Sequence, residues 1–416
     1  MGFSVFLYSL VTRIYFGAIY LFSFFKTKAK LWIEGRKNIF YSLETKISKC
    51  RPEQKRYWFH CASVGEFEQG RPLIEAVKKQ NPDAFVILSF FSPSGYELRK
   101  HYSGADLITY LPADNRHNAD RWFNILKPEK VFFIKYEFWY FFLKEAQRRK
   151  TDLYLVSAHF RKEQLFFSYF GKLQREMLRC FTYIFVQENS SEILLKSIGV
   201  ENVIISGDTR LDRVLEIKSE GIPLPLIHKF KGKHKVLVCG SSWPIDEKLV
   251  YNLWQNYLNQ KDWKLIIAPH EINQTEIFKL KSMFESSAST LLYSEISDNV
   301  RLENSRVIII DNIGILNKIY AYADLAYIGG GFGKGIHNIL EAAVYGIPVF
   351  FGPNNHKFQE ASALINIGQA IEIKSAEAMI STIENLDFEA IVEKSKRYFD
   401  SHNDVCKKIL HIINSN

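Results

Sequence analysis

Short apolar runs alternate with segments of helical spacing along most of the chain. A first series of runs covers 57–62, 84–90, 130–135, 153–158, 183–187 and 202–206, with helical spacing between them at 66–80, 115–127 and 136–149. A second series covers 235–241, 264–269, 306–311, 325–331 and 348–352. Continuous apolar strands separated by helices are typical of a parallel sheet covered on both faces. The pattern therefore predicts an α/β protein with two doubly wound, Rossmann-like domains facing a cleft.

Breaks in this pattern predict the domain boundaries. Segment 213–234 contains two prolines and a basic cluster, which favours a linker. The expected organisation is an apolar helix over 1–25, an N-terminal α/β domain over 26–212, the linker over 213–234, a C-terminal α/β domain over 235–395 and a C-terminal helix over 396–416. Ligands of doubly wound sheets bind beyond the carboxyl ends of the strands, so we expect the functional residues there.

The N-terminal run, residues 3–25, has the length of a membrane span, and its one charge is Arg13. A cleavable signal peptide would need an early charge and a small-residue cleavage site, and neither is present. A span would place Arg13 near its middle at a high cost, whereas a helix lying in the interface would let Arg13 snorkel. We favour a membrane-bound helix, with an apolar helix buried against its own domain as the alternative.

Charge supports the membrane interpretation. The chain carries a formal net charge of +9, and residues 26–56 hold ten Lys or Arg against three Glu. Such a local basic stretch favours an anionic membrane surface on the cytoplasmic side, and no nucleic acid is expected as a partner.

Composition and motif searches exclude several classes. Hydrophobic residues at 47% and charged residues at 24% exclude a disordered or low-complexity chain. The five cysteines are scattered with no CxxC pair, which disfavours structural zinc and a disulfide framework and favours a reducing compartment. The glycine run 329–335 fails the GxxxxGK[ST] pattern at Ile328 and Gly335, and fails GxGxxG at Ile336. No DxD, HExxH or GxSxG occurs, and we expect neither a metal nor a cofactor.

Two glutamates follow predicted strands of the first series. In HCASVGEFEQGRP (60–72), Gly65 would permit a tight turn that brings Glu66 to the site, where a carboxylate serves as a general base for a hydroxyl. The alternative is a capping box between Ser63 and Glu66. Glu137 lies among aromatic residues in KYEFWYFF (135–142), which predicts either a site carboxylate or a first-turn glutamate favoured by the helix dipole.

The richest segment is 328–353, where a strand ends in glycines and a helix is expected to begin near His337. Backbone N–H groups at Gly330, Gly331 and Gly335 would approach an anionic group. Glu341, expected on the same helix face as His337, would accept two ribose hydroxyls.

Together these motifs resemble those of the 3-deoxy-D-manno-octulosonic acid (Kdo) transferases of lipid A biosynthesis, over nearly the whole chain. The residues that match the family's motifs are Ala62 to Glu66, Pro93, Ser94, Gly95, Glu137, Trp139, Gly207, Arg210, Asp212, His337, Asn338, Leu340 and Glu341. The chain departs from the family's pattern in three motifs. His270 and Glu271 replace an Arg-His pair, Ile336 replaces a glycine, and Tyr140 replaces a proline.

The resemblance implies a B-type glycosyltransferase that is inverting and metal-independent and that works at the cytoplasmic face of the bacterial inner membrane. The N-terminal domain would bind the tetraacylated lipid A precursor, and the C-terminal domain would bind CMP-Kdo. Glu66 would be the catalytic base. The other expected substrate- or donor-binding residues are Ser63, Gly65, Ser94, Glu137, Arg210, Ser241, Ser242, His270, Gly330, Gly331, Lys334, Gly335, His337, Asn338 and Glu341. Since a phosphate-contacting arginine is missing, His270, Lys334 or Arg210 would compensate.

Two other interpretations stay open. A membrane-associated B-type glycosyltransferase that uses a UDP-sugar would share the fold and the ribose-binding glutamate. A non-catalytic nucleotide- or lipid-binding protein would share the cleft without needing Glu66. A dinucleotide oxidoreductase is disfavoured by the failed GxGxxG match.

Overall fold

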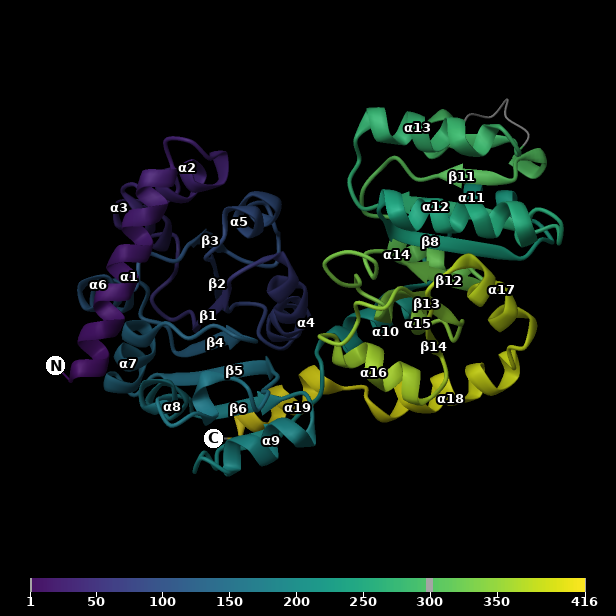
Figure 1. The fold of residues 1–416 in the computed structure, drawn as a ribbon. Coiled ribbons are helices and arrows are strands. Elements are labelled where there is room, and N and C mark those ends of the chain that lie inside the picture. The colour runs from purple at the N-terminus through teal and green to yellow at the C-terminus, as the bar shows by residue number, and fades with distance from the viewer. Residues whose placement is uncertain (1, 297–301, 416) are drawn as a thin grey trace. The chain divides into compact units, whose positions relative to one another are not determined.

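The chain forms two compact units in the computed structural model, which describes residues 2–296 and 302–415 (Figure 1). The first unit comprises Met1–Asp212 and Asp404–Asn416, and the second comprises Arg213–Asn403. Met1 and Asn416, which end the ranges expected for the first and last helices, lie outside the described residues.

A seven-stranded parallel sheet organises the first unit, with strand order β3-β2-β1-β4-β5-β6-β7. Its strands are β1 (Arg56–Cys61), β2 (Phe85–Phe90), β3 (Leu107–Tyr110), β4 (Lys130–Ile134), β5 (Asp152–Ala158), β6 (Tyr183–Val186) and β7 (Val203–Ile205). Successive residues along a strand pack into the hydrophobic cores on opposite faces of the sheet. Phe59 stacks on Phe132 on one face at 4.4 Å, while Trp58 packs against Phe133 on the other at 5.4 Å. Both faces are therefore buried, as the continuous apolar runs predict.

Helices cover both faces of this sheet. One face carries α4 (Val64–Gln80) and α19 (Val405–Asn414), and the other carries α3 (Ile39–Ile47), α6 (Arg116–Leu126), α7 (Tyr140–Arg148) and α8 (Lys172–Leu178) (Figure 1). The remaining helices are α1 (Phe3–Phe22), α2 (Thr27–Glu34), α5 (Pro93–Arg99), the short η1 (Leu165–Phe167) and α9 (Asn189–Lys196).

A second seven-stranded parallel sheet organises the other unit, in the order β10-β11-β9-β8-β12-β13-β14. Its strands are β8 (Val236–Ser242), β9 (Lys264–Pro269), β10 (Thr290–Leu292), β11 (Val307–Ile309), β12 (Leu325–Ile328), β13 (Val349–Phe351) and β14 (Ala370–Glu372). One face is covered by α12 (Pro244–Leu253), α13 (Gln274–Glu285) and α17 (Ala376–Glu384). The other helical segments are α14 (Leu316–Ile319), α15 (Leu340–Ala343), α16 (Gln359–Asn366) and the short η2 (Trp254–Leu258), η3 (Tyr293–Glu295), η4 (Leu302–Asn304) and η5 (Tyr320–Tyr322).

The predicted fold class is confirmed, since two doubly wound parallel α/β units are present. The apolar runs missed β3, β10 and β14, each of which lies at a sheet edge and has only three or four residues. An edge strand has one partner and is partly exposed, so it lacks the continuous apolar run of a central strand.

Two predicted segments differ from the structure. Segment 213–234, expected to be a linker, is largely helical and contains most of α10 (Arg210–Glu220) and all of α11 (Pro225–Lys231). The C-terminal segment 396–416, expected as one helix, contains the end of α18 (Phe388–Ser401) and the separate α19. The carboxylate of Asp212 accepts the backbone N–H groups of Val405 and Cys406 at 3.0 and 2.6 Å, which caps α19 within the first unit.

The apolar helix α1 is joined to the first unit through the Tyr8 hydroxyl and several aromatic rings. The Tyr8 hydroxyl donates to the buried carboxylate of Asp114 at 2.6 Å, and Asp114 also accepts the N–H groups of Phe141 and Phe142 at 3.2 Å. The N–H of Tyr140 donates to the Tyr8 oxygen at 3.3 Å. A proline at position 140, as is usual in the resembled family, would lack this N–H.

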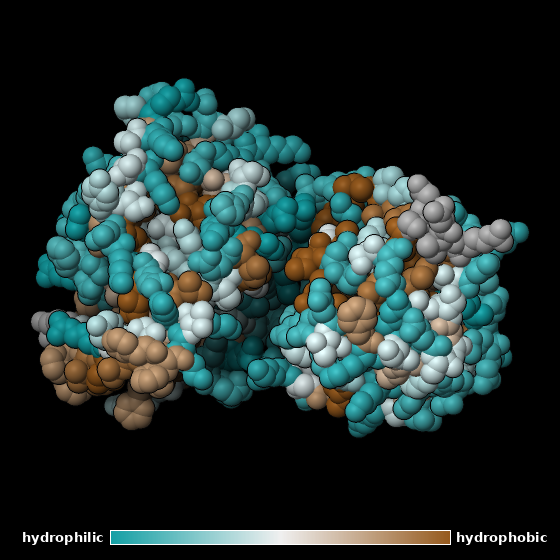
Figure 2. Space-filling view, turned by 90° about the horizontal axis from the view of Figure 1, so that it is seen from above, coloured by the Kyte–Doolittle hydropathy of each residue, from teal (hydrophilic) through white to brown (hydrophobic). Residues whose placement is uncertain are grey.

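Most of the α1 surface stays exposed. Phe16 stacks on Trp32 and Tyr15 on Phe91, but no described α1 residue is buried. The exposed apolar residues of α1 are Phe3, Phe6, Leu7, Leu10, Val11, Ile14, Tyr15, Tyr20, Leu21 and Phe22. Figure 2 shows apolar side chains gathered in a patch at one edge of the first unit. The alternative of a buried core helix is therefore wrong. By length and composition α1 is able to cross a membrane, as are many signal sequences.

Candidate active site

The candidate residues of the first unit all follow the carboxyl ends of strands. Ser63, Gly65 and Glu66 follow β1, and Ser94 lies at the start of α5 after β2. Glu137 follows β4, and Arg210 begins α10 after β7. Since β2, β1 and β4 are neighbours in the sheet, Ser94, Glu66 and Glu137 come from three adjacent strands.

Glu66 is both a helix cap and an electrostatically perturbed carboxylate. It accepts the backbone N–H of Ser63 at 3.1 Å and also that of Ala62, so its half of the predicted capping box is confirmed. Burial raises the pKa of Glu66 to about 8, the charge of Glu137 adds to this, and the two backbone N–H groups and Lys135 oppose it. A carboxylate with a pKa close to neutrality is suited to general-base chemistry.

The role expected for Gly65 is contradicted. It lies inside α4 rather than in a tight turn, and its φ is not positive. A Cβ at this position would meet nothing closer than the Ser63 Oγ at 3.9 Å. The turn into α4 therefore does not require glycine, and an exposed Gly65 leaves the surface beside Glu66 uncovered.

Glu137 is held by two aromatic residues. Its Oε2 lies 3.2 Å from the His60 Nε2 and accepts the Trp139 Nε1–H at 2.5 Å. The Trp139 ring stacks on Phe91, at the end of β2, with the centroids 4.7 Å apart. Nearby, the Ser94 Oγ lies 3.2 Å from the Ser92 Oγ, and Ser92 caps α5 by accepting the N–H of Gly95. The motif serine Ser94 therefore stays close to the cap of α5 at this edge of the sheet.

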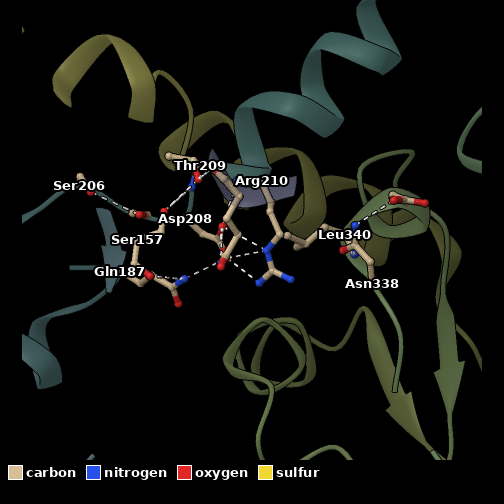
Figure 3. Close-up of polar contacts among 11 residues, drawn as sticks. Ser157, Gln187, Ser206, Asp208, Thr209, Arg210, Asn338 and Leu340 are labelled. Atoms are coloured by element: carbon tan, nitrogen blue, oxygen red, sulfur yellow. Dashed lines mark hydrogen bonds and ion pairs between the residues drawn. The ribbon is translucent and has the colours of Figure 1, made fainter. Parts of the chain in front are cut away.

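Arg210 is oriented by a buried carboxylate that the sequence analysis missed. Figure 3 shows Asp208 against the Arg210 guanidinium, with the Arg210 Nη2 at 2.6 Å and the Gln187 Nε2 at 3.3 Å from Asp208 Oδ2. Burial alone would raise the pKa of Asp208, but the charge and hydrogen bonds of Arg210 hold it below its usual range. Arg210 is thus fixed as a cation, although no local pattern distinguished Asp208 from an ordinary loop residue.

Lys135 is a second residue that the sequence analysis missed. It follows β4 with a φ of 66°, in the left-handed region that non-glycine residues seldom adopt. Its charge acts on both Glu66 and Asp208, in each case lowering the carboxyl pKa. Lys135 is therefore a basic group of the first unit whose charge stabilises the ionised form of both carboxylates. The sequence signal that could have identified Lys135 was its position at the carboxyl end of a buried strand.

In the second unit the glycine segment is held closed by its own contacts. Gly330 has a φ of 93° and donates its N–H to the buried Asp246 at 2.9 Å. The N–H groups of Gly333 and Gly335 donate to the carbonyl of Gly330 at 2.9 and 3.2 Å. A Cβ on Gly331 would approach the Gly352 nitrogen to 2.5 Å, so glycine is required there. The N–H groups of Gly330 and Gly335 are thus occupied within the protein, contrary to the anion-binding role expected of these two residues.

His337 lies before the helix rather than on it. Its N–H donates to the Gly329 carbonyl, and α15 begins only at Leu340, so the expectation that His337 and Glu341 share a helix face is wrong. The reason is local, since the Asn338 Oδ1 accepts the N–H of Leu340, the first residue of α15, at 3.2 Å (Figure 3). Asn338 also donates to the Glu341 Oε1 at 3.0 Å, which fixes the candidate ribose ligand.

His337 belongs to a stack of rings at this edge of the second sheet. Its ring lies 4.1 Å from that of His270, which in turn lies 4.8 Å from the Trp243 ring. The Trp243 Nε1–H donates to the His337 Nε2 at 3.2 Å, so His337 carries its hydrogen on Nδ1. Burial, and to a smaller extent His270, lower the pKa of His337 to about 4. His337 is therefore a neutral donor at physiological pH.

The other candidates of this unit lie at the end of β8 and in the glycine segment. Ser241 has a φ of 52°, and the Ser242 hydroxyl donates to Glu247 at 3.0 Å. A cavity of about 160 Å³ beside Ser242 is lined in part by Glu247 and Glu271. Such an acidic lining does not suit a phosphate group. Lys334 is exposed, and it remains available for an anion.

A metal site was also sought among the described residues. In ranges 2–296 and 302–415, no group of three His, Cys, Asp or Glu side chains is placed to hold a metal ion.

The class of protein follows from these features together with the comparisons. A solved structure, the UDP-GlcNAc 2-epimerase of Neisseria meningitidis bound to UDP-GlcNAc, aligns with a TM-score of 0.61 over 87% of this chain and 100% of that one, at 15% identity. Such a likeness concerns the fold alone, and the two doubly wound units form a glycosyltransferase B-type fold.

Sequence comparison shows similarity to one family of glycosyltransferases. Residues 38–213 match the family model Glycos_transf_N, described as 3-deoxy-D-manno-octulosonic-acid transferase (kdotransferase). The 3-deoxy-D-manno-octulosonic acid transferase of Aquifex aeolicus is 25% identical over 334 residues, which cover 79% of this chain and 85% of that protein. The corresponding transferase of Rickettsia typhi is 24% identical over 93% of this chain and 85% of that protein.

A third relative is longer. A bifunctional glycosyltransferase/methyltransferase of Fusobacterium nucleatum is 24% identical over 91% of this chain, and the match spans only 59% of that protein's length. The chain is a glycosyltransferase, and residues 38–213 carry the Kdo transferase family model.

Proposed function

We propose that this enzyme transfers Kdo from CMP-Kdo to a hydroxyl group of the lipid A precursor, with inversion at the anomeric carbon and without a metal ion. The observation that carries the proposal is Glu66. It is a carboxylate of perturbed pKa beyond a central strand, in a segment that matches the family model. The similarity to Kdo transferases supports CMP-Kdo as the donor and the lipid A precursor as the acceptor. The fold alone would suit a UDP-sugar donor equally well.

Glu66 takes the proton of the acceptor hydroxyl as the hydroxyl oxygen forms a bond to the anomeric carbon of Kdo. The bond from that carbon to the CMP phosphate breaks, and the electron pair leaves with CMP. Attack from the side opposite the phosphate inverts the configuration. With a pKa of about 8, Glu66 is a stronger base than an ordinary glutamate, although only a minor fraction is ionised at neutral pH.

On the donor side, Glu341 accepts the two ribose hydroxyls while Asn338 holds its carboxylate. Since the N–H groups of Gly330 and Gly335 are occupied by Asp246 and by the Gly330 carbonyl, side chains balance the charge of the leaving phosphate. The candidates are Lys334, His270 and Arg210. His337 acts as a neutral hydrogen-bond donor through its Nδ1–H, because its Nε2 accepts from Trp243.

We also propose that α1 lies in the plane of the membrane at its cytoplasmic face. Tyr8 and the ring contacts attach one side of α1 to the first unit, which leaves the other side for the lipid acyl region. The basic residues of 26–56 would contact anionic headgroups. Each Lys or Arg near such a surface contributes about 1 kcal/mol of attraction. This arrangement keeps the enzyme where its lipid acceptor lies.

The proposal is tested by incubating the purified full-length chain with CMP-Kdo and the tetraacylated precursor in detergent, followed by mass spectrometry of the lipid. UDP-glucose and UDP-GlcNAc replace CMP-Kdo in parallel reactions, and CMP and UDP compete as inhibitors. We expect Kdo to be added and CMP to inhibit more strongly than UDP. Transfer from a UDP-sugar alone would identify the competing glycosyltransferase, and release of no product with tight CMP binding would indicate a non-catalytic protein.

A further inference from the structure

A chain of buried hydrogen bonds leads from the core of the first unit to Glu137. The Trp58 Nε1–H donates to the Ser89 Oγ at 2.7 Å, and the Ser89 Oγ lies 2.9 Å from the His60 Nδ1. The His60 Nε2 lies 3.2 Å from the Glu137 Oε2. Trp58, Ser89 and His60 are completely buried, so the contacts among these three residues are shielded from water, while Glu137 is partly exposed. The register of the sheet builds this chain, because His60 on β1 pairs with Ser89 on β2.

The direction of the hydrogen bonds follows from the number of hydrogens available. Trp58 donates to Ser89, so the serine hydrogen goes either to the His60 Nδ1 at 2.9 Å or to the Phe59 carbonyl at 3.4 Å. The shorter contact is that to His60. The Trp139 Nε1–H lies 3.2 Å from the His60 Nε2, but Glu137 Oε2 is its closer acceptor at 2.5 Å. An imidazole that accepts at Nδ1 carries its hydrogen at Nε2, where it donates to the Glu137 carboxylate.

The Glu137 carboxylate acts on Glu66. Its charge is the largest contribution after burial to the raised pKa of Glu66. Among the described residues, Lys135, the Tyr8 phenol and the Cys61 thiol also interact electrostatically with this pair, and burial raises the pKa of Cys61 well above its usual range. Glu68 is in an ion pair with Arg99 at 2.7 Å and acts on Cys61. Cys61 and Tyr8 are neutral, so Glu137 and Lys135 set the local balance at Glu66.

We propose that His60 is a positioning residue for the transfer reaction. Its Nε2–H, oriented by Ser89 from the core, fixes the position of the Glu137 carboxylate, whose charge acts on Glu66. This inference rests on the proposed function for its consequence in catalysis, but not for the contact itself. His60 does not touch substrate; it acts through Glu137, which sets the basicity of Glu66.

The test reads the ionisation of Glu66 directly and needs no substrate. The protein is labelled with ¹³C at the glutamate carboxyl carbons, and the Glu66 resonance is assigned by its disappearance in Glu66→Gln. The resonance is then titrated with pH in wild type, His60→Phe and His60→Gln. His60→Phe keeps the ring volume without a donor, so Glu137 loses a partner of its charged form and the Glu66 pKa falls by roughly one unit, the size of a close like-charge effect. His60→Gln retains a donor near the Nε2 position and stays close to wild type.

Ser89→Ala supplies a second variant should His60→Phe fail to fold, with a smaller shift in the same direction. His117→Phe, at an exposed position on α6, is the matched control and leaves the titration unchanged. In a Glu137→Gln background, the effect of His60→Phe on the Glu66 pKa vanishes. A purely structural His60 would lower the melting temperature without moving the Glu66 titration, and that result overturns the inference.

The acid limb of kcat/KM for Kdo transfer moves with the Glu66 titration in each variant. If wild type does not transfer Kdo at all, the proposed function fails while the carboxyl titration still decides the role of His60.

Discussion

Glu66→Gln separates the two roles of this side chain by activity. Glutamine keeps an oxygen that accepts the Ser63 N–H, so the cap of α4 survives while the base is lost. General-base catalysis contributes about 10²- to 10⁴-fold, and we expect kcat to fall by that factor. In wild type a pKa of about 8 leaves roughly one tenth of Glu66 ionised at pH 7, so kcat/KM falls about tenfold for each pH unit below 8.

The same substitution has an opposite effect on stability. Between the usual pKa near 4.5 and about 8, the folded wild type keeps a proton on Glu66 that the unfolded chain releases. The stability of wild type relative to Glu66→Gln therefore falls as the pH rises through this window, by about 1.4 kcal/mol per unit. At pH 9 the variant is more stable by on the order of 4 kcal/mol, and at pH 5 the two are nearly equal.

The assay combines thermal melts at pH 5, 7 and 9 with rates of Kdo transfer measured by mass spectrometry. Glu68→Gln is the matched control, because Glu68 lies on the same helix in a half-exposed ion pair with Arg99. We expect it to change neither the slope of stability with pH nor the acid limb of the rate. Glu66→Gln with wild-type turnover would show that Glu66 is only a cap, and equal melting temperatures at pH 9 would refute the raised pKa.

Three further predictions concern the donor, the membrane and metal ions. Glu341→Ala weakens CMP binding about tenfold by calorimetry with a similar loss in kcat/KM, since a ribose contact acts in the ground and transition states alike; an unchanged Kd would remove the ribose assignment. Deletion of residues 1–25 releases much of the protein from phosphatidylglycerol vesicles and lowers the melting temperature, because Asp114 loses the Tyr8 hydroxyl; an aggregated chain would show instead that α1 is needed for folding. Dialysis against EDTA leaves the initial rate unchanged, and a rate restored only by Mg²⁺ would contradict a metal-independent reaction.

Much of the fold was predictable because buried parallel strands leave a continuous apolar signature. Central strands such as β1 and β9 were found within one or two residues of their bounds. The edge strand β10 was not, since three residues with one partner carry little pattern. The helix expected near His337 begins only at Leu340, whose N–H donates to the Asn338 side chain. The spacing of apolar residues does not predict this side-chain contact.

The site was predictable only as far as strand ends determine it. Glu66 and Glu137 lie at neighbouring strand ends, as doubly wound topology requires. Their partners were not predictable, since the contact of His60 with Ser89 depends on the register between two strands. Asp208 and its bond to Arg210 likewise arise from a loop conformation that local sequence does not encode.

The most direct test of the account is the mass of the lipid formed from CMP-Kdo and the tetraacylated precursor by wild type and Glu66→Gln in parallel. The account predicts a product that carries added Kdo with wild type, together with one released CMP for each Kdo added. It predicts almost no product with Glu66→Gln, although that variant still folds and binds CMP. Absence of Kdo transfer by a folded wild-type enzyme, or equal transfer by the two proteins, would contradict it.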